Sequence, residues 1–94
     1  MERSKSIVVT ANGQIGTAGN KGYIFSVTVM ATGAAVGTVS LYDGTSAAAT
    51  EKYRLTVPGT VHDCRTSSNL SIYCVNGLYC TLTNAVGVIE YQGF

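Results

Sequence analysis

Apolar and polar residues alternate along most of the chain, as they do in β-strands that bury one face. Phe25, Val27 and Val29, for example, are each followed by a residue suited to the opposite face. Neighbouring side chains of a strand point to opposite faces, so this spacing predicts a strand with one apolar side. The same alternation recurs at residues 38–42, 52–57, 70–75, 78–83 and 86–91, with shorter apolar runs at 7–10 and around Ile15. The pattern predicts about eight short strands and no helix.

Turn-forming dipeptides separate these runs. They are Asn12-Gly13, Asp43-Gly44, Pro58-Gly59 and Asn76-Gly77. Asn76-Gly77 joins two runs of like pattern and suits a type I′ turn, which predicts a β-hairpin over residues 70–83. Short strands at this spacing predict an all-β fold, either a small β-sandwich or a jelly-roll-like barrel. We expect a single β domain over residues 7–94, preceded by a polar N-terminal arm at residues 1–6.

The apolar positions of these strands predict the core. We expect it to contain Phe25, Val27, Val29, Val39, Leu41, Leu55, Leu70, Ile72, Leu78, Leu82 and Val88.

Charge is scarce in this chain. Charged residues are 12% of its 94 residues, against about 25% in a typical soluble domain, and the mean hydropathy is +0.23. A core of this size is modest, and so few charges leave two interpretations. Either Thr, Ser and Gly suffice to solvate the surface of a monomer, or part of the surface is buried against other chains, which is the interpretation that we favour. The net charge is +1, without a basic cluster, so we expect no nucleic-acid partner. No apolar run reaches the length of a membrane-spanning helix, and the start lacks a signal-peptide pattern, so we expect no membrane partner and synthesis in the cytoplasm of whatever cell makes the protein.

Residues with reactive side chains form no recognisable motif. The three cysteines, Cys64, Cys74 and Cys80, are an odd number, and we expect them to be reduced and mostly buried. His62 and Cys64 would share a strand face, but adjacency alone does not make a catalytic pair. The cysteine spacings lack the C-x2-C of zinc sites, and Asp43-Gly44 reads as a turn rather than a calcium loop. We therefore expect no enzyme activity and no metal or cofactor.

Tyrosines are frequent, with six in the chain. Tyr42, Tyr73 and Tyr79 can fall on the polar faces of their strands. Exposed aromatic side chains on a sheet are typical of a ligand or partner surface, with a carbohydrate platform as one option. The alternative is packing in the core or between subunits.

The order of strands and turns also carries a family resemblance over residues 7–91. It rests on GYIFSVTV, on GTVSLYDGTS, on NGLYCTLT and on the final VGVIEY. This order resembles the small structural virion proteins of tailed bacteriophages. The resemblance implies a compact β-sandwich or jelly-roll-like fold and a structural role in the virion. For the members that decorate heads it implies binding to the major capsid protein, commonly as a homotrimer.

Two functions follow as expectations. The first is a decoration or cement protein on the phage head, with Arg3 and Lys5 of the arm helping it to attach. The second is a small fibre, neck or tail module that recognises a host-surface glycan through exposed tyrosines. The residues expected to bind partners are Arg3, Lys5, Tyr42, Tyr73 and Tyr79.

Overall fold

The computed structural model describes residues 4–59 and 63–94 of the chain. This part of the protein forms nine strands and no helix. The strands are β1 (Lys5–Val9), β2 (Gly13–Ile15), β3 (Gly22–Ala31), β4 (Gly37–Asp43), β5 (Thr50–Val57), β6 (Cys64–Ser67), β7 (Ile72–Cys74), β8 (Leu78–Thr83) and β9 (Ala85–Gly93). The expected all-β class is therefore confirmed.

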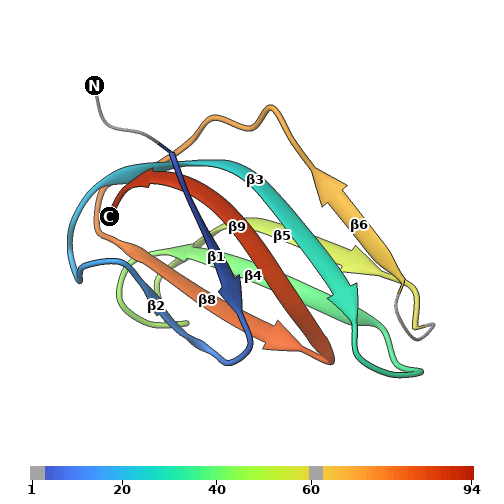
Figure 1. Cartoon of the computed structure of the whole chain (residues 1–94). Coiled ribbons are helices and arrows are strands. Elements are labelled where there is room, and N and C mark those ends of the chain that lie inside the picture. The colour runs from blue at the N-terminus through green and yellow to red at the C-terminus, as the bar shows by residue number, and fades with distance from the viewer. Residues whose placement is uncertain (1–3, 60–62) are drawn as a thin grey trace.

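The strands form two antiparallel sheets packed face to face (Figure 1). The first sheet has the order β1-β9-β3-β6, and β7 pairs with β3 on the same side as β6. The second sheet has the order β2-β8-β4-β5. Since β6 and β7 follow each other along the same edge of β3, the nine strands occupy eight positions, the number that the alternation predicts.

The pairing is nested along the chain. β1 pairs with β9, β2 with β8, β3 with β6 and β7, and β4 with β5. The first half of the chain thus meets the second half in reverse order, as one long antiparallel ribbon that rolls up between two sheets. This is the arrangement of a jelly roll, one of the two architectures expected.

The Asn76-Gly77 turn does not close a hairpin, so that prediction is wrong. β7 pairs with β3 in the first sheet, whereas β8 pairs with β4 and β2 in the second, so the turn carries the chain from one sheet to the other. The Asp43 carboxylate holds this corner by accepting the backbone N–H groups of Val75 at 3.0 Å and Asn76 at 2.8 Å. Local sequence specifies the tight turn, but the partner of each strand is chosen by the sheets on either side.

The core lies between the sheets. Of the expected members, Val27, Val29, Val39, Leu41, Leu55 and Leu78 are buried. Leu70, Ile72 and Leu82 are half-buried and pack against this core. Further buried side chains that the expectation omitted are Val9, Ile15, Ile24, Ala31, Val57, Cys74, Cys80, Ala85, Ile89, Tyr91 and Phe94.

Two expected core residues take the other side of their strands. The register of β3 against β9 shifts between Ile24 and Ser26, so Phe25 is the extra residue of a β-bulge and is only half-buried. In β9 the inward positions are Gly87, Ile89 and Tyr91, and Val88 points outward with 36% of its surface exposed. The alternation in β9 is as predicted, but the prediction that Val88 faces the core is wrong, because the alternate residues do so.

The N-terminal boundary also differs from the expectation. β1 begins at Lys5, so Lys5 and Ser6 belong to the first sheet rather than to an arm. Lys5 lies opposite Tyr91 in the register, and Ser6 lies opposite Glu90. Residues 1–3, with the expected contact Arg3, lie outside the described part of the chain.

Candidate functional site

The outer face of the first sheet collects most of the exposed apolar side chains. Val8 of β1 lies opposite Val88 of β9, and Val86 of β9 lies opposite Met30 of β3. Val8 is 63% exposed and Met30 is 39% exposed. Five of the seven exposed large apolar side chains of the described residues lie on this face. The other two, Val36 and Val75, lie in connections between strands.

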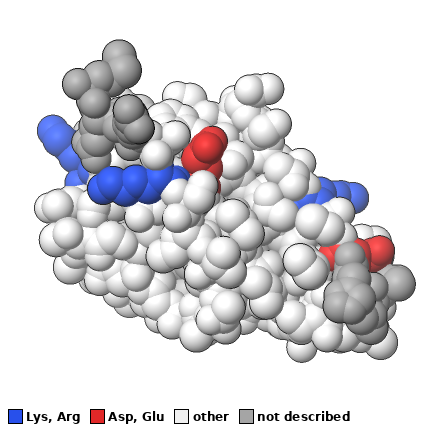
Figure 2. Space-filling view, in the orientation of Figure 1, with Lys and Arg blue, Asp and Glu red and all other residues white. Residues whose placement is uncertain are grey.

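This face carries little charge. Among the cross-strand partners that point outward from β1, β9, β3, β6 and β7, Glu90 is the one charged residue of the described chain. Figure 2 shows charged groups gathered along the top left and at the right end, with a wide uncharged surface between them. Single exposed apolar residues are common on proteins, but a grouped and uncharged set is typical of a contact surface.

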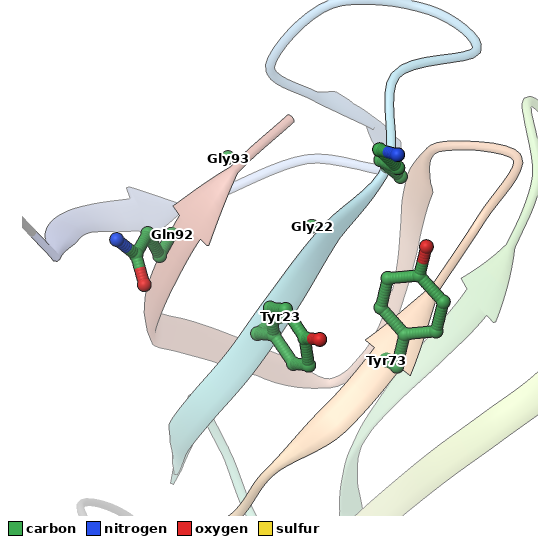
Figure 3. A pocket seen from close by; sticks show the side chains of 6 residues that line it. Gly22, Tyr23, Tyr73, Gln92 and Gly93 are labelled. Atoms are coloured by element: carbon green, nitrogen blue, oxygen red, sulfur yellow. The ribbon is translucent and has the colours of Figure 1, made fainter. Parts of the chain in front are cut away.

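One end of the same face carries a row of polar and aromatic side chains. Gln92 of β9, Tyr23 of β3 and Tyr73 of β7 are cross-strand neighbours. The ring centroids of Tyr23 and Tyr73 are 4.9 Å apart and the ring planes are tilted by 35°. Figure 3 shows the three side chains following one another across the strands, with Gly22 and Gly93 beside them. Together with Lys21 these residues line a hollow of about 330 Å³, which we call the tyrosine hollow.

The floor of the tyrosine hollow is backbone. Gly22 and Gly93 are register partners, and Gly93 has a positive φ of 89°. A Cβ atom on Gly22 would lie 2.8 Å from the Phe94 ring, and one on Gly93 would lie 2.8 Å from the Lys21 carbonyl oxygen. Packing of Phe94 beneath the sheet therefore requires glycine at position 22, and the hollow lies on the opposite, outer side of this backbone, beside Tyr23 and Gln92.

A second hollow adjoins the first and shares Lys21 and Gly93 with it. Its other lining residues are Lys5, Thr17, Asn20 and Phe94. Two lysines thus line this end of the molecule, and none of the Asp and Glu residues that the structure describes lines either hollow. Among the described residues Lys21 makes no ion pair, and its side chain is exposed.

The tyrosines expected at the site divide between two faces. Tyr73 lies in the tyrosine hollow, whereas Tyr42 and Tyr79 lie opposite each other on the outer face of the second sheet. Lys5 lines the second hollow, and Arg3 is outside the described residues. The expected residues therefore do not form one surface.

Tyr23 is the residue of the tyrosine hollow that sequence reasoning missed. Strict alternation with Phe25, Val27 and Val29 places Tyr23 on the inner face, but the bulge at Phe25 reverses the phase and turns Tyr23 outward. Phe25 then stacks on Tyr23, with centroids 6.4 Å apart and planes within 4°. The signal available in the sequence was the frequency of aromatic residues in this strand, not their spacing.

Reactive side chains are not gathered. All three cysteines are free, as expected. Cys74 and Cys80 are buried, in agreement with the expectation, whereas Cys64 is exposed and departs from it. Burial raises the pKa of the Cys74 thiol to about 11 and that of the Cys80 thiol to about 12. For Cys74 the Asp43 carboxylate adds to this effect. These two thiols therefore stay protonated and unreactive at neutral pH. His62, the other member of the His62–Cys64 pair considered above, lies outside the described residues.

Neither a metal site nor a membrane span is found in residues 4–59 and 63–94. No three His, Cys, Asp or Glu side chains gather there as metal ligands would. That part of the chain also holds no helix with the length and apolarity to cross a bilayer. Comparison with protein-family models and with curated proteins finds no match to this chain.

Proposed function

We propose that the protein is a structural virion protein that decorates the head of a tailed phage and binds its lattice of major capsid proteins. The observation that carries this proposal is the grouped, uncharged apolar face around Val8, Met30 and Val88. The family resemblance of the sequence supports the same role. A decoration protein needs a rigid body and a surface that repeats on each copy, and a jelly roll with an apolar outer face supplies both.

The edge strand β1 adds a second means of attachment. β1 borders the first sheet, so one side of its backbone has no partner strand within the described residues. An unpaired strand edge can bind an extended segment of a neighbour through backbone hydrogen bonds. Val8 lies on β1, so an apolar contact and an edge contact would fall next to each other.

We further propose that the protein acts as a homotrimer, the state that the resemblance implies. Each copy has only a few exposed apolar residues, so one contact would be weak, and three linked contacts would be much stronger. Light scattering is expected to give a mass three times that of the 9.8-kDa chain. A monomer at every concentration tested would contradict the trimer in solution.

The capsid role is tested on purified heads that carry the protein. Replacing Val8 and Val88 by threonine keeps the β-branched shape and removes apolar area, so occupancy of the heads should fall. The matched control replaces the other two exposed valines, Val36 and Val75, which lie off this face. Equal occupancy of both variants would contradict the proposed contact.

The number of copies per particle distinguishes the possible positions in the virion: hundreds indicate head decoration, and a handful indicate neck or tail.

A second candidate function rests on a different observation. The tyrosine hollow offers two adjacent aromatic rings beside the polar groups of Lys21 and Gln92, a composition suited to a carbohydrate. This supports a fibre, neck or tail module that recognises a glycan on the host surface. Binding of the isolated protein to a glycan array tests it, and binding to no glycan would count against it.

A further inference from the structure

We infer that the tyrosine hollow binds an acidic carbohydrate, with a sugar ring against Tyr23 and Tyr73 and a sugar carboxylate beside Lys21. The inference rests on the second candidate function and names the class of glycan. It does not depend on the capsid role.

The aromatic pair sets where the ring would lie. Tyr23 and Tyr73 are adjacent across β3 and β7, and both are more than 40% exposed. Their rings form a continuous shelf rather than two parallel walls, because the planes are tilted by 35° at a centroid separation of 4.9 Å. A shelf of this kind covers the C–H face of a pyranose and leaves the sugar hydroxyls free to bond with water and polar groups.

Lys21 sets the charge of the ligand. It precedes Gly22 at the start of β3, on the same side of the strand as Tyr23, about 7 Å along the strand. Among the described residues Lys21 makes no ion pair and no carboxylate lines the hollow, so its ammonium group is available to an anion.

The hollow is the right size for one sugar residue and open enough for a chain. Its volume of about 330 Å³ falls at the lower end of small-molecule sites. It adjoins the second hollow through Lys21 and Gly93, so a longer sugar chain could extend from one hollow into the other.

Single-stranded nucleic acid is the competing ligand, because it too combines aromatic stacking with positive charge. Such sites track the phosphates with a basic groove, whereas this chain has six Lys and Arg in total and a net charge of +1. The observations therefore favour a sugar whose carboxylate needs one cation, Lys21.

The test compares two probes that differ only in charge. The full chain is titrated with trigalacturonic acid and with its fully methyl-esterified form, which keeps the rings and neutralises the carboxylates. We expect the acid to bind about tenfold more tightly than the ester, as a charged hydrogen bond implies. Backbone chemical-shift changes should centre on Lys21, Tyr23 and Tyr73.

Variants assign the two contributions. Lys21→Gln should abolish the preference for the acid, and Tyr73→Thr should weaken both probes by about tenfold. The controls are Lys52→Gln and Tyr42→Ala, which lie in the second sheet and should leave both affinities unchanged.

The remaining outcomes would contradict either the acidic class of the ligand, glycan recognition as such, or the location of the site. Equal binding of acid and ester would overturn the acidic class but leave glycan recognition standing. Binding of neither probe, or tighter binding of a thymidine oligonucleotide, would overturn both. Loss of binding in Tyr42→Ala, with chemical-shift changes on the second sheet, would show that the ligand binds the outer face of the second sheet and not the tyrosine hollow.

Discussion

At the scale of single residues, the connection from β2 to β3 depends on Gly16. Its φ is 73°, and Phe94 packs against it while the Phe94 carbonyl oxygen accepts the N–H of Thr17. A Cβ atom at this position would lie 2.7 Å from the Phe94 Cβ. Gly19 in the same connection has a φ of 78° but open space around it, and Gly13 has neither constraint.

These three glycines give a graded prediction. Gly13→Ala should change the free energy of unfolding by less than about 0.5 kcal/mol. Gly19→Ala should cost about 1 to 2 kcal/mol through the left-handed backbone alone. Gly16→Ala should cost more than Gly19→Ala, because the clash with Phe94 adds to the same strain. Urea denaturation of the three variants measures the series, and a Gly16→Ala variant as stable as Gly13→Ala would contradict the packing of Phe94.

The buried thiols make stability depend on pH in the alkaline range. The pKa of Cys74 is raised to about 11 and that of Cys80 to about 12, from an ordinary value of 9.0. The thiols of the unfolded chain therefore lose their protons first as the pH rises above 9.0. The contribution of the two buried thiols to stability is complete below pH 9.0 and is lost as the pH rises through the pKa values of the folded protein.

We therefore expect the melting temperature to fall between pH 9 and pH 11. Measured against each protein's own melting temperature at pH 7, the fall should be smaller in Cys80→Ala than in the wild type. Cys64→Ala, at the exposed cysteine, is the matched control and should retain the wild-type slope. In the folded protein at pH 8, a thiol reagent should label Cys64 rapidly and the other two only after unfolding. An unchanged slope in Cys80→Ala would show that its thiol is not the group that titrates.

At the scale of elements, the inward phase of β9 decides which valine supports the fold. Val88 faces outward beside Val8, whereas Val27 of β3 is fully buried. The bulge at Phe25 similarly decides that Ile24 and Val27, three positions apart, both face the core. Strand phase is a property of the sheet, since the same alternating sequence can present either set of side chains to the interior.

The same truncation at both valines tests this phase. Val27→Ala should cost about 1.5 to 3 kcal/mol of unfolding free energy, because it removes buried apolar atoms and leaves a cavity. Val88→Ala should cost less than about 1 kcal/mol in dilute solution, where contacts between copies are absent. Equal losses in chemical denaturation would show that Val88 belongs to the core after all.

At the scale of the whole molecule, the nested ribbon makes nearly all pairing distant in sequence. β1 and β9 lie near opposite ends of the chain and pair with each other, and among the strands of residues 4–59 and 63–94 only β4 and β5 pair as neighbours along the chain. At two corners a hydrogen bond joins the two arms of the ribbon: the Asn12 side-chain oxygen accepts the Leu82 N–H at 2.7 Å, and the Ala31 N–H donates to the Asp63 carbonyl at 2.8 Å. Closing such long loops costs chain entropy before the contacts form.

Refolding should accordingly be slow for a chain of this size. We expect a relaxation time between milliseconds and seconds after dilution from denaturant, as for other all-β domains rich in distant contacts. Stopped-flow fluorescence of the tyrosines measures it. Folding within microseconds would contradict the nested pairing, because it requires contacts that are mainly local.

The sequence by itself determined the class of the fold, because period-two alternation and Gly- and Asn-rich turns are local properties of the backbone. It placed Val27, Val29, Val39 and Leu41 in the core correctly for that reason. It could not determine the partner of each strand: the Asn76-Gly77 turn is equally compatible with a hairpin and with the sheet-to-sheet corner that forms. Nor could it determine that the bulge turns Tyr23 outward beside Tyr73, on the opposite side of the molecule from Tyr42 and Tyr79. Pairing, phase and the tyrosine hollow depend on burying both sheets against each other at once, which no single segment specifies.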